Sequence, residues 1–268
     1  MKLGRRSLLL TGAAIPTAAY GQCVVNAPAV DACRGGVRNA GPAGATLDLN
    51  FMFPGSMPTG VTFTRASTAT WTDASGVIQT AAVNQPRWDY DPTTHVLKGL
   101  LIEGASAPRA QDQCGILAAN MAPWFSVVGT WAAEFITTNP TPDSNRILGA
   151  AVSAGGGVTP LTIGNNPWPL GQYDGASFFP STNNVTPNIV QKAAHASSGA
   201  GGAAKLCLNG IITTAPFITN GFASLATSGI RFFQTVTGPS ADNGSGYIRR
   251  VQFWPRVLTD AEMQQVTT

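Results

Sequence analysis

Short strand-like runs begin near residue 46 and recur to the end of the chain, and those at 46–51 and 61–64 alternate apolar and polar residues. The clearest runs are 46–51, 61–64, 69–72, 130–137, 205–208, 211–214, 229–233 and 247–254. Alternation with a period of two is typical of strands that have one buried face and one solvated face. Turn residues separate the runs, and the Asn-Gly pair at 209–210 is a strong hairpin signal. The pattern predicts an all-β protein built as an antiparallel β-sandwich.

One helix start is recognisable, close to the C-terminus. Thr259 can cap a helix over 259–266, and Glu262, three residues later, can reach back to it as in a capping box. We therefore expect one short C-terminal helix, packed at the edge of a single sandwich unit over residues 46–268.

The composition fits this fold class. The chain has 268 residues, of which 44% are hydrophobic, so it can bury a substantial core. It is rich in Gly (30) and Pro (19) and has only three glutamates, so the usual helix-forming surface residues are scarce. Strands and turns are favoured over helices.

The charge pattern narrows the choice of partner. The net charge of +3 comes from Lys2, Arg5 and Arg6, because residues 23–268 hold 13 basic and 13 acidic side chains, a difference of zero. Such a surface lacks the basic footprint of a protein that binds nucleic acid or an anionic membrane. Sugars and other proteins are the favoured partners.

Residues 1–22 have the layout of an export signal, with a basic start, an apolar run at 8–15 and small residues after it. Arg5 and Arg6 are also similar to a twin-arginine signal. The apolar run is too short to span a bilayer, so no membrane span is expected. Two interpretations stay open: the segment is cleaved, or it is retained as an anchoring arm. Residues 23–45, rich in Gly, Pro and Ala, are interpreted as a linker.

The four cysteines are Cys23, Cys33, Cys114 and Cys207. Cys23 and Cys33 are close enough in sequence to bridge with little loop-closure cost, so we predict a disulfide between them. Cys114 and Cys207 are either partners or buried thiols. The chain has no C-x-x-C spacing, so a zinc site is not expected, and no cofactor is predicted.

The densest polar stretch is VNQPRWDYDPTTHVLKGLLIE, residues 83–103. We predict a strand followed by a turn, with Arg87 paired to Asp89 on one face and Trp88 and Tyr90 on the other. Asp91 precedes a proline and is interpreted as a turn starter. Two aspartates at alternate positions could share a metal ion, but the pairing and the turn account for both, so no metal site is predicted.

Residues 63–103, which include FTRASTAT, DASG, PRWDYDP and GLLIE in that order, resemble a module of tailed-bacteriophage structural proteins found in tail fibres and in head or tail decoration proteins. The chain differs after Glu103, where residues 104–109 replace an acidic residue and an Arg-Thr-Asn-Leu run. The resemblance implies a virion component that contacts other virion proteins, with 46–110 as a structural β module within the same sandwich unit. It also implies a homo-oligomer, since phage fibres and spikes are often trimers.

The second half, 111–268, resembles a concanavalin A-like, laminin G-like jelly roll. The matching pieces are 131–136, 205–214 and 246–266, where a final strand with Trp-Pro-Arg leads into the capped helix. Carbohydrate binding is frequent in this fold, although a fold does not fix a function.

Catalytic patterns are weak in this chain. Glu103, Glu134 and Glu262 are at least 31 residues apart, so no strand carries the carboxylate pair, about 5 Å apart, of a retaining glycosidase. No G-x-S-x-G motif occurs, and the only candidate bases are His95, in a predicted turn, and His195, in a small-residue stretch. Both histidines are expected at the surface, and a non-enzymatic protein is predicted.

Trp168 is the candidate recognition aromatic, because two prolines flank it in a predicted loop. Asn166 and Tyr173 lie beside it, and we interpret residues 164–184 as polar loops that bind a carbohydrate or another partner. Trp131 and Trp254 lie in predicted strands and are expected in the core.

These observations predict a non-enzymatic virion component, a fibre or decoration protein, that displays a lectin-like sandwich for host-surface glycan binding or virion attachment. Two alternatives stay open: an exported lectin-like bacterial protein, periplasmic or extracellular, and a glycan hydrolase on the same fold.

Overall fold

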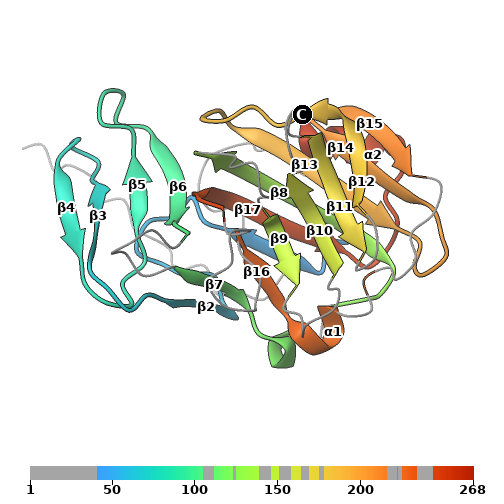
Figure 1. Ribbon diagram of the computed structural model, residues 1–268, viewed down its shortest axis with the longest axis horizontal. Helices are drawn as coiled ribbons and strands as arrows, with labels where there is room; N and C mark the ends of the chain where they lie inside the picture. Colours follow the sequence, from blue (N-terminus) through green and yellow to red (C-terminus); the bar gives the residue numbers. More distant parts are fainter. Residues whose placement is uncertain are drawn as a thin grey trace, which may run out of the picture. The chain divides into compact units, whose positions relative to one another are not determined.

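The computed structural model describes residues 41–104, 112–122, 125–138, 146–150, 158–163, 169–174, 178–215, 222, 225–233 and 244–268. Within these ranges all strand pairs are antiparallel, and two large sheets pack face to face, which confirms the predicted β-sandwich (Figure 1). Two short helical turns, η2 (Ala118–Asn120) and α1 (Leu225–Ser228), occur in addition to the predicted C-terminal helix.

Sheet A has the strand order β15-β14-β13-β8-β17-β6-β5, with β1 also paired to β17. Its strands are β1 (Leu47–Asn50), β5 (Trp88–Tyr90), β6 (Leu97–Ile102), β8 (Gly129–Thr137), β13 (Gln191–Ser197), β14 (Ala204–Leu208), β15 (Ile211–Ala215) and β17 (Gly246–Trp254). Strands from the first and last parts of the described chain therefore lie side by side. The predicted Asn-Gly turn joins β14 to β15.

Sheet B has the order β12-β11-β10-β9-β16-β7-β2. Its strands are β2 (Val61–Thr64), β7 (Gln113–Ile116), β9 (Arg146–Ala150), β10 (Val158–Ile163), β11 (Pro169–Asp174), β12 (Phe178–Asn184) and β16 (Ile230–Phe232). A separate hairpin consists of β3 (Ala69–Thr72) and β4 (Ile78–Ala81). Residues 46–104 thus contribute strands to both sheets as well as this hairpin.

The main core fills the space between the sheets. Trp131 of β8 packs against Phe253 of β17 with ring centroids 4.7 Å apart, and Phe51 meets Phe232 of sheet B edge-on at 5.6 Å. Trp131 and Trp254 are fully buried, as predicted. Burying large aromatic side chains is the main favourable contribution to such a core.

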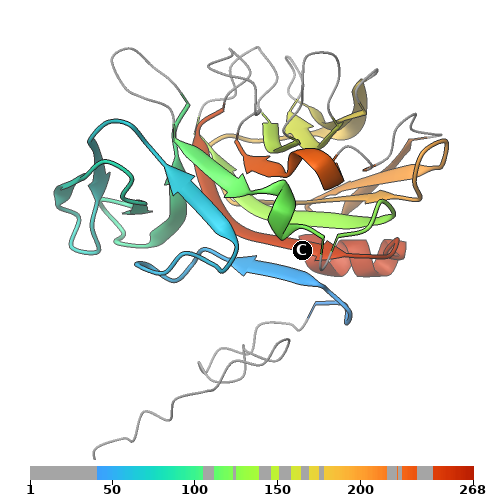
Figure 2. The same cartoon turned by 90° about the horizontal axis from the view of Figure 1, so that it is seen from below.

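The C-terminal helix α2 (Asp260–Thr267) has the predicted capping box, in which Thr259 and Glu262 exchange hydrogen bonds. Met263 packs with Trp254, Ala194 and Cys207, so the helix covers the outer face of sheet A (Figure 2, red). The prediction that it packs at an edge is therefore wrong. The small side chains on this face of sheet A let the helix approach closely.

The interpretation of 164–184 as loops is also wrong for the described part, because β11 and β12 lie there. Prolines and a glycine concealed these strands, since such residues have low strand propensity. Their positions are nevertheless permissive: Pro169 begins β11, and Pro180 lies in β12, which is an edge strand.

Candidate functional site

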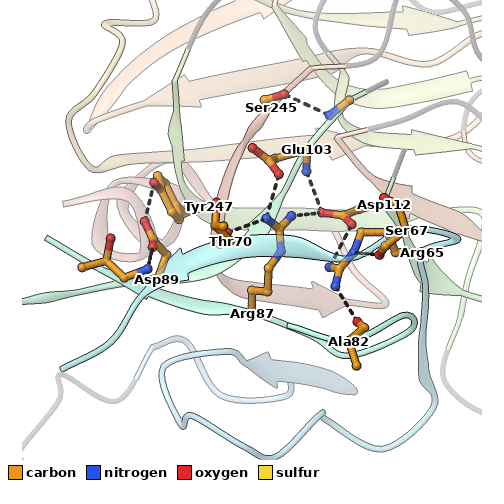
Figure 3. A network of polar contacts seen from close by, with 12 residues as sticks. Arg65, Ser67, Thr70, Ala82, Arg87, Asp89, Glu103, Asp112, Ser245 and Tyr247 are labelled. Carbon is orange, nitrogen blue, oxygen red and sulfur yellow. Dashed lines mark hydrogen bonds and ion pairs between the residues drawn. The ribbon is translucent and has the colours of Figure 1, made fainter. Parts of the chain in front are cut away.

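The polar stretch at 83–103 forms part of a buried ionic network centred on Arg87 (Figure 3). Arg87 Nη1 donates to Glu103 Oε2 at 2.7 Å and to the Thr70 carbonyl at 2.9 Å, and Nη2 donates to Asp112 Oδ2 at 2.6 Å. Asp112 is fully buried and also accepts from the Glu103 amide at 2.9 Å. Charge-assisted hydrogen bonds of this length are strong and directional.

Arg65 is the second cation of the network. It follows β2 directly, and its Nη1 lies 3.4 Å from Asp112 Oδ1. Its other guanidinium nitrogens donate to the Ala82 carbonyl at 2.7 Å and the Ser67 carbonyl at 2.8 Å. The formal charges of the network cancel, because Arg65 and Arg87 are balanced by Asp112 and Glu103. Buried charges are costly unless they are paired with opposite charges. The network joins the end of β2, the β3–β4 hairpin and strands β5 and β6.

Asp89 does not pair with Arg87, so that prediction is wrong. Its Oδ1 accepts from the Thr72 amide at 2.6 Å and its Oδ2 from the Tyr247 hydroxyl at 2.8 Å, with Lys98 Nζ at 3.5 Å. The physical reason is that both side chains bond backbone groups of the neighbouring strand β3. Arg87 donates to the Thr70 carbonyl, and Asp89 accepts from the Thr72 amide. Each side chain therefore satisfies a backbone group rather than the other side chain.

Tyr247 and Asp91 are also held by hydrogen bonds. Burial, with the neighbouring Asp89 carboxylate, raises the pKa of the Tyr247 hydroxyl, so Tyr247 stays a neutral hydrogen-bond donor. Asp91 accepts from the Thr93 and Thr94 amides and forms the predicted turn. The network therefore connects the β3–β4 hairpin to β5 of sheet A through polar contacts.

Glu134 and Glu262, like Glu103, form ion pairs with arginines. Glu134 Oε1 lies 2.5 Å from Arg249 Nε, and Glu262 Oε1 lies 2.6 Å from Arg256 Nη2. With the Glu103 pair described above, each of the three glutamates of the chain pairs with an arginine. Hydrogen bonds from Arg256 and from the Thr259 amide lower the pKa of Glu262 to about 2.

The two histidines have opposite environments. His95 is exposed in the turn between β5 and β6, as expected, with Nδ1 3.1 Å from the Ala74 carbonyl. His195 was expected at the surface, but it is a buried residue of β13 with its ring edge-on to Phe222 at 4.9 Å. Burial lowers the pKa of His195 to about 3. The small neighbours that suggested a loop are instead the positions over which α2 packs.

Cys114 and Cys207 are buried free thiols, which settles the alternatives for this pair. They lie in different sheets, on β7 and β14, and burial raises the pKa of both. Cys23 and Cys33 lie outside the described residues, so their disulfide stays a prediction.

The predicted recognition residues are only partly described. Asn166 and Trp168 lie outside the described ranges, whereas the backbone of Tyr173 belongs to β11, directly opposite Phe178 of β12. Phe178 is 38% exposed, more than any other aromatic side chain that the structure describes. Sequence reasoning missed it, because the residues of β12, FFPSTNN, do not alternate between apolar and polar; the period of two appears only in their burial.

No helix in the described part of the chain is long and apolar enough to cross a membrane. In the same ranges, no group of three or more His, Cys, Asp and Glu side chains lies close enough together to hold a metal ion.

No protein-family model and no curated protein sequence matches the chain. Similar solved structures do exist. Domain 4 of AbnA, a GH43 extracellular arabinanase from Geobacillus stearothermophilus solved with arabinotriose, is 11% identical with a TM-score of 0.53, over 84% of this chain and 98% of that domain. The Ruminococcus gnavus IT-sialidase CBM40 bound to α2,3-sialyllactose is 21% identical with a TM-score of 0.43, over 53% and 83%. The first similarity shows a shared β-sandwich fold.

Proposed function

We propose that this protein is a non-enzymatic bacteriophage virion component, a fibre or decoration protein, which displays a lectin-like sandwich for host-surface glycan binding or virion attachment. One observation carries the structural part of this proposal. The charged side chains of residues 83–103, which lie within the phage-like segment 63–103, all bond groups of the same chain; they are Arg87, Asp89, Asp91, Lys98 and Glu103. A structural role, in which these side chains hold the β3–β4 hairpin by polar contacts, therefore accounts for the stretch without a reaction.

A non-enzymatic role is supported by the state of the three glutamates and of His195. Each glutamate is paired with an arginine, and His195 is buried between β-sheet neighbours. A general base has to reach its substrate within hydrogen-bond distance, which a histidine with only 1% exposure cannot do without a rearrangement.

Glycan recognition is supported by the chemistry of the exposed face of β11 and β12, which has polar, uncharged and aromatic residues. The AbnA domain that shares the fold was solved with a neutral arabino-oligosaccharide. Residues 1–22 favour a second candidate, an exported lectin-like bacterial protein that would use the same surface.

The decisive experiment is mass spectrometry of purified phage particles from the strain that encodes this chain. Peptides from residues 41–268 at a stoichiometric level support the virion assignment. Their presence only in the culture fluid or periplasm of phage-free cells would replace it with the exported lectin.

A glycan array and a polysaccharide depolymerisation assay test the activity of the purified protein. We expect binding without release of oligosaccharides. The Trp168→Ala variant should bind more weakly if Trp168 belongs to the site, and unchanged binding would remove it. Release of oligosaccharides by the unmodified protein would contradict the non-enzymatic assignment.

A further inference from the structure

The outer face of β11 and β12 has a simple composition. Three residue pairs lie directly opposite each other, Pro169 with Asn184, Gly171 with Pro180, and Tyr173 with Phe178. Residues opposite each other in an antiparallel pair project from the same face of the sheet. The alternate residues, Leu170, Gln172 and Ser181 among them, are buried on the inner face. The residues of this outer face whose side chains the structure describes are therefore all uncharged: Pro169, Gly171, Phe178, Pro180, Thr182 and Asn184.

Phe178 lies against the strand instead of extending away from it. A Cβ atom built at Gly171 would overlap Cε2 and Cζ of the Phe178 ring, so the ring occupies the space that a side chain at position 171 would take. Gly171 is buried for this reason, although it faces outward. The ring keeps 38% of its surface exposed. An aromatic ring supported from below by backbone is a platform on which an apolar ligand face can stack.

The residues along β12 provide polar groups beside this platform. Thr182 and Asn184 are exposed on the same face, and the Thr182 hydroxyl lies 3.0 Å from Thr213 Oγ1 of β15. Phe178 and Asn184 lie opposite Tyr173 and Pro169, which are four residues apart on β11, so they are separated by about 13 Å along the sheet, at roughly 3.3 Å per residue. That length fits an oligosaccharide better than a single sugar.

The charge of the face decides the class of ligand. A buried or stacked carboxylate requires a cation or several hydrogen-bond donors as partners, and the described residues of this face include no Lys, Arg or His. Lys205 of the nearby β14 pairs with Asp260 of the helix on the outer face of sheet A. Sialylated and uronic-acid glycans are therefore disfavoured.

We infer that the outer face of β11 and β12 binds a short neutral oligosaccharide, with a pyranose ring stacked on Phe178 and with Thr182 and Asn184 bonding sugar hydroxyls. This inference rests on the proposed glycan-binding function and names the ligand class and the central residue of its site.

The test measures binding of the full chain to immobilised neutral and sialylated oligosaccharides. Phe178→Ala should weaken binding to the neutral glycans at least tenfold, and Phe178→Leu should weaken it similarly, because leucine keeps apolar bulk without a planar face. Phe178→Trp should preserve binding. Gly171→Ala keeps the ring but displaces it, and should also weaken binding. Ile78→Ala, at a 72% exposed apolar position in the β3–β4 hairpin, is the matched control and should have no effect.

Equal melting temperatures establish that each variant is folded. Unchanged affinity in Phe178→Ala, full binding by Phe178→Leu, or a preference for sialylated over neutral glycans would each overturn this site while leaving glycan binding intact. Failure of the unmodified protein to bind any glycan would overturn both the site and the proposed recognition function.

Discussion

Replacing Asp112 with asparagine is the most informative test of the ionic network in Figure 3. Asparagine has the same shape, so the change removes the negative charge without opening a cavity. Asp112 accepts hydrogen bonds from Arg87, Arg65 and the Glu103 amide, and it has no solvent exposure. In Asp112→Asn, two guanidinium groups with 1% exposure would keep one carboxylate in the network, that of Glu103, which bonds Arg87.

The expected magnitude follows from the burial. Removing one partner of a buried ion pair costs about 3–5 kcal/mol, because the remaining charge is left uncompensated. Glu103 stays in place and the asparagine carbonyl still accepts one hydrogen bond, so we expect a loss near the lower limit, about 3 kcal/mol. For a chain of this length, that corresponds to a fall in melting temperature of roughly 6–12 °C.

Urea unfolding of the full chain provides the measurement. The midpoint should fall while the slope m stays constant, which identifies a change in stability and not in the surface exposed on unfolding. Asp48→Asn is the matched control, because Asp48 pairs with Arg250 but is 40% exposed, and exposed pairs contribute about 1 kcal/mol or less. Equal midpoints for the two variants would show that the buried network contributes no more than a surface pair, which would refute the reasoning.

Two further predictions concern pH. His195 has a pKa of about 3 in the folded chain, so as the pH falls the unfolded chain protonates this histidine first. The free energy of unfolding should therefore decrease by roughly 2 kcal/mol as the pH is lowered from about 6.5 to 5. Urea midpoints of His195→Leu should lack this pH-dependent decrease, whereas those of His95→Leu should keep it. The pKa of Glu262 is lowered to about 2, so Glu262→Gln should cost about 1 kcal/mol at pH 7. The difference in melting temperature between Glu262→Gln and the unmodified protein should shrink as the pH falls from about 4.5 towards 2. A difference that does not depend on pH would contradict the lowered pKa of Glu262.

The strands with regular alternation could be predicted from the sequence because local pattern and tertiary role agree in them. β1, β2 and β3 alternate apolar and polar residues, the Asn-Gly pair marks the β14–β15 hairpin, and the capping box fixes the start of α2. Residues far apart in sequence then meet through register, as when Leu47 pairs with Phe253. Local alternation predicts a strand but does not say which strand becomes its neighbour.

The remaining features depended on information that local sequence does not carry. The stretch around His195 has the small residues of a loop, but they are small because α2 packs across the outer face of β13. The partner of Arg87 lies 25 residues away at Asp112, beyond the range of a same-strand pairing argument. Phe178 became a candidate only when register brought its ring over Gly171.

The β3–β4 hairpin explains why the densest polar stretch of the chain is structural. A two-stranded hairpin is marginally stable alone, and its strand β4 is mostly solvent-exposed, with Ile78 at 72%. Its position depends on polar contacts: Arg87 bonds the Thr70 carbonyl and Asp89 bonds the Thr72 amide. Such side-chain bonds need charges with fixed positions, and the buried Asp112 fixes Arg87. The concentration of charge at 83–103 is thus the consequence of attaching a hairpin that has little hydrophobic contact of its own.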